Sequence, residues 1–163
     1  IYLREHEIKM EECFCGELIE ELETIVTPSL ETKNQKLNIN ITNEKIKCNK
    51  ALLLTVFVNI VDNARKASDE GKEISITGKI DDDGSYEFVV EDYGIGMKQE
   101  DVERICDEFY MVDKSRSRKE GGAGIGMSLV AIIMEKHNAV LNVESEINKG
   151  TRMILSGFER VKV

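Results

Sequence analysis

Tryptophan is absent from this sequence of 163 residues, which also has one proline, two histidines and no apolar run long enough to span a bilayer. No signal peptide is recognisable. We therefore expect a domain that lies in the cytoplasm. Because the sequence opens on Ile1 rather than methionine, we interpret it as a piece of a longer protein, which would meet a membrane only through segments outside these residues.

A net positive charge is also missing. The 22 Lys and Arg are outnumbered by 31 Asp and Glu, which gives a formal charge of −9. Nucleic-acid binding needs a basic face, so this composition argues against a nucleic-acid partner. A triphosphate site in so acidic a chain must gather its positive charge locally. The candidates are Lys66 and the cluster Lys114, Arg116, Arg118 and Lys119, although such a cluster is more typical of a solvated loop.

The four cysteines lack the spacing of a metal site. Cys13 and Cys15 are close in sequence, but no histidine is near them and no pair of Cys-x-x-Cys hooks is present. We expect reduced thiols, with Cys48 and Cys106 packed as small apolar groups.

Apolar residues make up 41% of the chain, enough for one domain with a substantial core. Their spacing predicts helices and strands that are segregated rather than strictly alternating. The expected fold class is α+β, a two-layer sandwich with a mixed, mostly antiparallel sheet and helices on one face. Helices are predicted at about 1–33, 49–68, 98–108 and 124–137, strands at 37–41, its short partner 46–48, 72–80, 86–91, 140–145 and 151–158, and a long polar loop at 111–123.

The predicted helix at 49–68 has two distinct faces. Its apolar residues from Leu53 to Ala64 gather on one side at about 100° per residue, whereas Asn59, Asn63 and Lys66 gather on the other. Asparagine is a poor helix former, so two of them one turn apart need a reason. An amide oxygen is a hard ligand suited to Mg²⁺, and a lysine one turn later can reach a phosphate. The alternative is a solvated face that happens to carry two asparagines.

Two glycine-rich turns follow. In Asp92-Tyr93-Gly94-Ile95-Gly96-Met97 a carboxylate at a strand end can accept from the exocyclic amine of adenine, and the glycines let the backbone approach the ring. The run Gly121-Gly122-Ala123-Gly124-Ile125-Gly126 precedes a helix, whose N-terminus favours phosphate. Either turn alone could serve only the backbone. Walker and Rossmann patterns fit poorly, because no Gly-Lys-Ser/Thr is present and a charged loop precedes the second turn.

In this order, the asparagine helix and the two glycine turns resemble the catalytic, ATP-binding domain of bacterial sensor histidine kinases, which belongs to an ATPase superfamily with the Bergerat fold. The resemblance covers about residues 16–160. The matching segments are residues 59–67 for the N box, 92–97 for the G1 box, Phe109 for the F-box aromatic, 122–130 for the G2 box, and Ser145 with Gly150-Thr151 for the closing strand turn.

The resemblance implies ATP and Mg²⁺ as cofactors. Asn63 would ligate the metal, Asn59 and Lys66 would address the phosphates, and these three residues would form the catalytic set. Asp92 would bind the adenine amine, with support from Thr151. The remaining implied nucleotide contacts are Gly94, Ile95, Gly96, Met97, Phe109, Gly122, Gly124, Ile125, Gly126 and Met127, with Arg116 and Arg118 as lid contacts to phosphate.

One departure within the superfamily bears on the reaction. Hydrolytic relatives place a glutamate four residues before the magnesium-binding asparagine, where it activates water, but this chain has Asn59 there. The resemblance therefore implies transfer of the γ-phosphoryl group to another acceptor rather than hydrolysis.

Neither histidine is expected to be that acceptor. His6 lacks the later Thr-Pro of the family's acceptor box and leaves no room for a helical hairpin, so we interpret it as an exposed helix residue. We interpret His137 as a C-terminal capping or surface residue. The acceptor is expected on the dimerisation domain of the same protein, outside this chain, or on another protein, with a response regulator as the downstream partner.

The expected organisation is a tail of the dimerisation helix or a linker at residues 1–15, then the catalytic domain at 16–163, with a lid at about 111–123. The main alternative is a stand-alone protein-serine kinase of the anti-sigma-factor type, which the size suits but the leading helix does not. A non-catalytic interaction module with the same fold is a further alternative.

Overall fold

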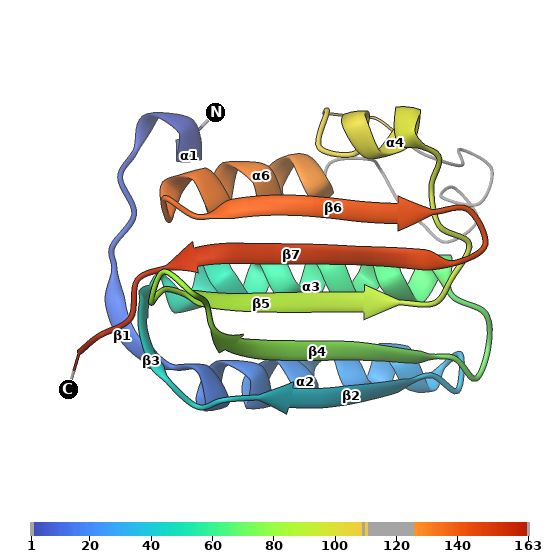
Figure 1. The fold of residues 1–163 in the computed structure, drawn as a ribbon, viewed down its shortest axis with the longest axis horizontal. Helices are drawn as coiled ribbons and strands as arrows, with labels where there is room; N and C mark the ends of the chain where they lie inside the picture. Colours follow the sequence, from blue (N-terminus) through green and yellow to red (C-terminus); the bar gives the residue numbers. More distant parts are fainter. Residues whose placement is uncertain (1, 109, 111–125, 163) are drawn as a thin grey trace.

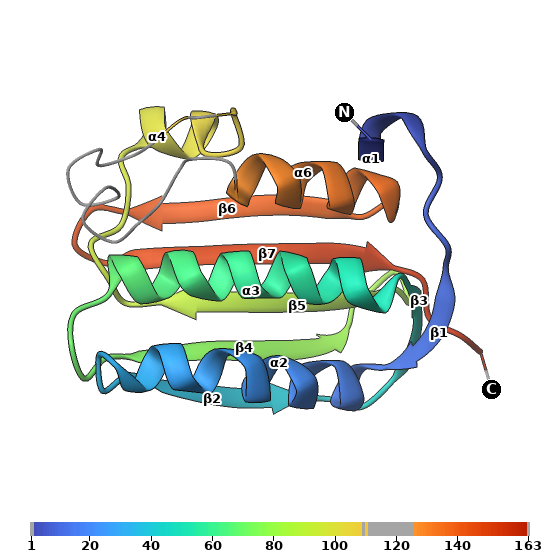
Figure 2. The same ribbon diagram turned by 180° about the vertical axis from the view of Figure 1, so that it is seen from behind.

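The computed structural model describes residues 2–108, 110 and 126–162, which form a sheet covered by helices on one side (Figure 1). The elements are α1 (Tyr2–Glu5), β1 (Glu11–Phe14), α2 (Cys15–Glu31), β2 (Lys36–Ile41), β3 (Lys45–Cys48), α3 (Lys50–Ala67), β4 (Glu73–Ile80), β5 (Tyr86–Asp92), α4 (Gln99–Arg104), α6 (Gly126–Lys136), β6 (Val140–Glu146) and β7 (Gly150–Phe158). The main sheet has the order β2-β4-β5-β7-β6, with β2 and β4 parallel and the other neighbours antiparallel. Helices α2, α3 and α6 lie over one face of it (Figure 2). The predicted two-layer α+β sandwich is therefore confirmed.

Helix α3 lies over the middle of the sheet. Its N-cap is Asn49, whose side-chain oxygen accepts the backbone N–H of Leu52 at 3.0 Å. The apolar face predicted from the sequence is buried, and Phe57 packs edge-on against Phe88 of β5 with ring centroids 5.0 Å apart. Since this face fixes the helix on the sheet, the polar stripe with Asn59 is turned away from the core.

Strand β5 alternates strictly between buried and half-buried positions. Tyr86, Phe88, Val90 and Asp92 are the buried set. The first three are core residues, so the period of two places the carboxylate of Asp92 on the helix-facing side of the sheet, at the end of the strand. Burying a charged group costs free energy unless a partner compensates the charge. The end of β5 is therefore a candidate for a functional site.

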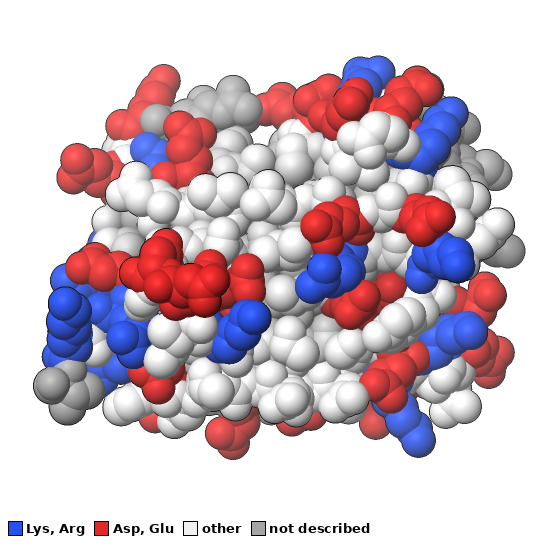
Figure 3. Space-filling model, viewed as in Figure 1, with Lys and Arg blue, Asp and Glu red and all other residues white. Residues whose placement is uncertain are grey.

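The open face of the sheet carries charges of both signs (Figure 3). Arg152 of β7 lies between Glu91 of β5, at 3.7 Å, and Glu144 of β6, at 2.8 Å. Among the described residues visible on this face, basic side chains do not merge into one continuous surface.

The helix predicted over residues 1–33 is interrupted: α1 and α2 are helical, but the residues between them are not. Residues Glu11–Phe14 form β1, and α2 starts only at Cys15. The segment Ile46–Cys48 is a strand as predicted, but its partner is β1 and not β2. The reason is that β2 pairs along its whole length with β4, in parallel, and β1 supplies the antiparallel partner for β3. The assignment of residues 1–15 to a linker or dimerisation helix stays a prediction.

His137 was predicted to be a C-terminal capping or surface residue. Because it is buried, the surface position is wrong, whereas its contact with a carbonyl in the last turn of α6 confirms the capping role. Its Nε2 accepts the backbone N–H of Asn49 at 3.0 Å, and its Nδ1 donates to the carbonyl of Ile133 at 2.8 Å. Burial lowers its pKa. The ring therefore joins the end of α6 to the start of α3. His6 is exposed, as expected, but it lies just after α1 ends at Glu5 and is not a helix residue.

The cysteines are free. Cys48 is buried and Cys106 is half-buried against the core, which confirms their apolar packing. Within the described residues, no group of three His, Cys, Asp or Glu side chains is arranged to hold a metal ion. Within the same residues, every helix is too short or too polar to cross a bilayer.

Candidate functional site

The end of β5 holds a buried carboxylate. Asp92 is 6% exposed, and it accepts hydrogen bonds from the backbone N–H of Gly94, at 2.9 Å, and of Thr151. Burial raises the pKa of Asp92 to about 6, even though these two donors act in the opposite direction. The carboxylate is thus fixed in orientation but only partly compensated, so a further N–H donor from a ligand would be favourable.

The turn after β5 is tied to two neighbours. The backbone N–H of Ile95 donates to the carbonyl of Ala67 at the end of α3, at 2.9 Å. The carbonyl of Ile95 accepts the N–H of Asn148, in the turn between β6 and β7, at 2.8 Å. One residue thereby holds together the end of the asparagine helix, the end of β5 and the closing hairpin.

Both glycines of this turn are required by close backbone contacts. A Cβ on Gly94 would lie 2.2 Å from the carbonyl oxygen of Ala67. Gly96 has a φ of +66°, and a Cβ there would lie 1.9 Å from the carbonyl oxygen of Glu146. The Asp-x-Gly-x-Gly pattern therefore has a steric cause, because the turn could not sit against α3 and β6 with larger residues.

Ser145 was assigned from the sequence to the closing strand turn, but it was not among the predicted nucleotide-binding residues. Its hydroxyl accepts the backbone N–H of Met97 at 2.8 Å, donates to the carbonyl of Gly150 at 3.0 Å, and lies 2.8 Å from the hydroxyl of Thr151. Ser145 and Thr151 are cross-strand partners of β6 and β7, and Thr151 is in turn the partner of Asp92. The signal that could have found Ser145 is its place one strand away from Thr151 in a short hairpin.

On α3, Asn59 contacts the first turn of α6. Its side-chain N–H donates to the carbonyl of Thr55 at 2.8 Å. A Cβ on Gly126 would lie 2.6 Å from the side-chain oxygen of Asn59. The oxygen is therefore turned toward the start of α6, and the glycine leaves space beside it that a larger residue would fill.

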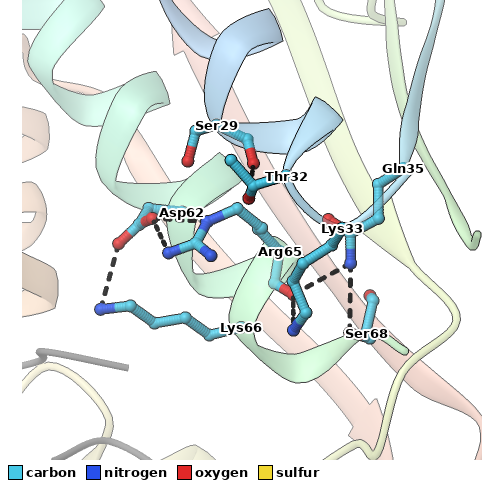
Figure 4. A network of polar contacts seen from close by, with 8 residues as sticks. All are labelled: Ser29, Thr32, Lys33, Gln35, Asp62, Arg65, Lys66 and Ser68. Carbon is cyan, nitrogen blue, oxygen red and sulfur yellow. Dashed lines mark hydrogen bonds and ion pairs between the residues drawn. The ribbon is translucent and has the colours of Figure 1, made fainter. Parts of the chain in front are cut away.

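The end of α3 carries a polar network with residues that follow α2 (Figure 4). Asp62 contacts Lys66 at 3.1 Å and Arg65 at 2.9 Å. The carbonyl of Arg65 accepts from the side chains of Lys33 and Gln35, each at 3.1 Å. Asp62 was not among the predicted site residues, yet its carboxylate contacts the Lys66 ammonium.

The predicted site residues that are described form two groups. Asp92, Gly94, Gly96, Met97 and Thr151 are joined by the strand-end contacts, and Asn59 meets Gly126 across α3 and α6. The two groups adjoin where Ile95 binds Ala67, which is one helical turn beyond Asn63. Met97 and Met127 are both buried. Outside the described residues lie Phe109, Gly122, Gly124, Ile125, the basic cluster Lys114, Arg116, Arg118 and Lys119, and the lid predicted at 111–123.

Comparison with protein families matches residues 48–159 to the family described as histidine kinase-, DNA gyrase B- and HSP90-like ATPase. The matched range contains α3, both glycine turns and the closing hairpin, which are all the elements of the site described above.

Individual proteins are also similar. The sensor-like histidine kinase SenX3 of Mycolicibacterium smegmatis is 35% identical over 115 residues, which are 71% of this chain and 30% of the relative. Among solved structures, the mycobacterial sensor histidine kinase MprB superposes with a TM-score of 0.82 at 20% identity, over 94% of this chain and all of the other. Full-length ShkA in complex with AMPPNP gives a TM-score of 0.83 at 20% identity, over 97% of this chain and 33% of the other. The chain thus spans about a third of the length of the curated relative.

Proposed function

Because this chain belongs to the histidine kinase-, DNA gyrase B- and HSP90-like ATPase family, we propose that it binds Mg-ATP between the end of α3 and the ends of β5 and β7. We further propose that it transfers the γ-phosphoryl group to a histidine on the dimerisation domain of a two-component sensor kinase, which would in turn serve a response regulator. The names of SenX3 and MprB, both sensor histidine kinases, support this choice over a serine kinase.

The observation that most supports adenine binding is the carboxylate of Asp92. It is buried, oriented by two backbone N–H groups, and has its pKa raised to about 6 by burial. The exocyclic amine of adenine is an N–H donor of the kind this carboxylate lacks. The turn that follows Asp92 carries the apolar side chains of Ile95 and Met97, which we propose as the apolar contacts of the base.

The α3 stripe supports the phosphate and metal part of the proposal. Asn63 and Asn59 offer amide oxygens, which are the hard oxygen donors that Mg²⁺ accepts alongside water and phosphate. The side-chain N–H of Asn59 donates to the carbonyl of Thr55, and its oxygen faces the start of α6. When bound, Mg²⁺ would neutralise phosphate charge, and Lys66 would add a positive charge one turn along the helix.

The same geometry disfavours hydrolysis. An amide cannot take a proton from water near neutral pH, so Asn59 cannot act as the general base that a glutamate at this position would be. The chain's residues would then only position the triphosphate and balance its charge. His137 is buried and engaged on both ring nitrogens, so it cannot be the phosphate acceptor.

Two measurements test the proposal. Calorimetric titration with ATP should give micromolar-range binding that depends on Mg²⁺. Incubation of the chain with labelled ATP and the dimerisation domain of the parent protein should label that domain on an acid-labile phosphohistidine. An acid-stable phosphoserine on a partner protein would instead favour the anti-sigma-factor type of kinase, and the absence of ATP binding by a folded sample would favour a non-catalytic module.

A further inference from the structure

Cys13 of β1 and Cys48 of β3 are buried side by side, with their sulfur atoms 3.0 Å apart. Both are free thiols in this structure. We infer that the pair is a site of reversible oxidation, at which a small disulfide such as oxidised glutathione joins β1 covalently to β3. The two strands lie at the end of the sheet opposite to the one where β5 finishes (Figure 1), so the inference does not rest on nucleotide binding.

The pairing of β1 with β3 places both thiols on one face. In the antiparallel register Cys13 lies opposite Ile46, and Cys48 is two residues further along β3. Because side chains alternate along a strand, Ile46 and Cys48 share a face, and both are buried. Cys48 is thus the diagonal neighbour of Cys13. Their sulfur separation of 3.0 Å exceeds the length of a disulfide bond by about 1 Å, a gap that a small rotation of the side chains can close.

Cys15 is buried near this pair but has a different partner. Its thiol contacts the hydroxyl of Tyr86 in β5, and its backbone N–H donates to the carbonyl of Glu44 at 2.8 Å. The Cys13 thiol contacts that of Cys48 instead. The structure therefore favours a bond from Cys13 to Cys48 over one from Cys13 to Cys15, although the latter two are much closer in sequence.

The reaction is thiol–disulfide exchange in two steps. The thiolate of Cys13 attacks one sulfur of oxidised glutathione, which forms a mixed disulfide and releases the first glutathione. The sulfur of Cys48 then attacks the Cys13 sulfur and releases the second glutathione. Two electrons pass from the protein to glutathione, and the two protons of the protein thiols end on the two glutathione thiols. Cys13 reacts first because it is the less buried of the two and because burial raises the pKa of the Cys48 thiol.

Access to the two sulfur atoms depends on β1. This strand has four residues and forms the outer edge of its small sheet, because Ile46 of β3 also bridges Arg160 on its other side. Short edge segments open at a lower free-energy cost than core strands, so the oxidant reaches Cys13 when β1 separates briefly from β3. Once the bond has formed, β1 cannot separate. The bond also closes the chain from residue 13 to residue 48 into a loop, which restricts the unfolded state.

The test counts thiols after the folded chain has been incubated with oxidised glutathione. The remaining thiols are alkylated in denaturant, and the peptides are identified by mass spectrometry. We expect two of the four cysteines to escape alkylation, in peptides joined through Cys13 and Cys48, and dithiothreitol to restore all four. The oxidised chain should also unfold at a higher urea concentration than the reduced chain.

Matched variants assign the bond to this pair. Cys15→Ala should form the same bond, whereas Cys13→Ala should form none, and its urea midpoint should not rise after treatment. If Cys13→Ala does not fold, Cys13→Ser replaces it in the same comparison. Four alkylated cysteines in the treated parent chain would overturn the inference. So would a bond between Cys13 and Cys15, or a bond to Cys48 that forms only after the chain has been unfolded.

Discussion

The two sides of the candidate site are built in opposite ways. At the strand ends, Asp92, Thr151 and Ser145 are held by backbone and cross-strand hydrogen bonds between two segments distant in sequence, residues 92–97 and 145–151. On α3, the polar side chains mostly contact their own helix, Asn59 the carbonyl of Thr55 and Lys66 the carboxylate of Asp62. The strand side is therefore fixed by the fold before any ligand arrives.

This difference suits the two sides to different parts of the nucleotide. A flat base is recognised by a few directional hydrogen bonds, so its pocket gains from a rigid frame. Phosphates and a metal ion are recognised mainly by charge. Side chains that leave a partner on their own helix and bind the ligand instead are sufficient for this. Changes on the strand side should therefore affect stability and binding together, and changes on the helix side should affect binding alone.

The largest effect is expected from Gly96→Ala. The substitution adds a Cβ 1.9 Å from the carbonyl of Glu146 to a residue with a φ of +66°. The matched control is Gly71→Ala, because Gly71 has a φ of +81° but no atom within 4 Å of its added Cβ. Urea unfolding should show a loss of roughly 3–5 kcal/mol for Gly96→Ala and about 1 kcal/mol for Gly71→Ala. Equal losses would mean that the contact between the turn and β6 is unimportant.

The second prediction concerns pH. The pKa of Asp92 is about 6 in the folded protein against a usual value of 3.8, a difference worth about 3 kcal/mol. Because the folded value is the higher one, the stabilising contribution is complete below pH 3.8 and is lost as the pH rises through about 6. The Asp92→Asn side chain does not ionise, so the variant does not lose this contribution. Its free energy of unfolding relative to the parent chain should therefore increase between pH 4 and pH 7, as measured by urea unfolding at each pH. Curves that stay parallel would contradict the burial of this charge.

Asp92→Asn should weaken nucleotide binding, although it should stabilise the folded protein at neutral pH. At pH 7.5 the variant should be the more stable protein and yet bind ATP more weakly by about 1.5–3 kcal/mol, the strength of a hydrogen bond to a charged group. Glu91→Gln is the control, since Glu91 is the preceding residue of β5 and points to the open face, where it lies near Arg152. An Asp92→Asn chain that binds ATP normally would remove this carboxylate from the site.

The helix side is probed by Asn63→Ala, for which we expect little change in the unfolding free energy because the side chain is only half-buried. The affinity for ATP in the presence of Mg²⁺ should fall by at least about tenfold. Removing a residue that only supports a metal ligand already costs about this much. In excess EDTA the variant and the parent chain should bind ATP equally. Asn142→Ala, on an exposed position of β6, serves as the control that should change neither value.

Several features of the fold and site could be predicted because they are local. The apolar face of α3 and the strand at 86–91 each depend on residues within one element, and both predictions are confirmed. The strands predicted at 72–80 and 86–91 are separated by only a short turn, and they pair as β4 and β5. The steric need for Gly94 and Gly96 could be suspected from the motif, although the backbone atoms that enforce it belong to α3 and β6.

Other features could not be predicted from such patterns. The segment Glu11–Phe14 continues a helical-looking sequence, but its pairing with β3 makes it a strand. His137 looks like a surface residue at the end of a helix until the N-cap of α3 is placed against its ring. Ser145 was assigned to the closing strand turn from the sequence, but only the arrangement of β6 beside β7 reveals its three contacts.

The order of chemical groups was determined by the sequence by itself: an amide-bearing helix, a carboxylate closing a strand, and glycines where the backbone must come close. Only the tertiary structure decided which of these groups lie next to each other. The backbone hydrogen bond from Ile95 to Ala67 joins the turn after β5 to α3, and β7 of the closing hairpin pairs with β5 at Asp92. The physical reason is that period and propensity act within a single element. Contacts between elements depend on which faces pack together, and that free energy is gained only when the whole sheet and its helices are assembled.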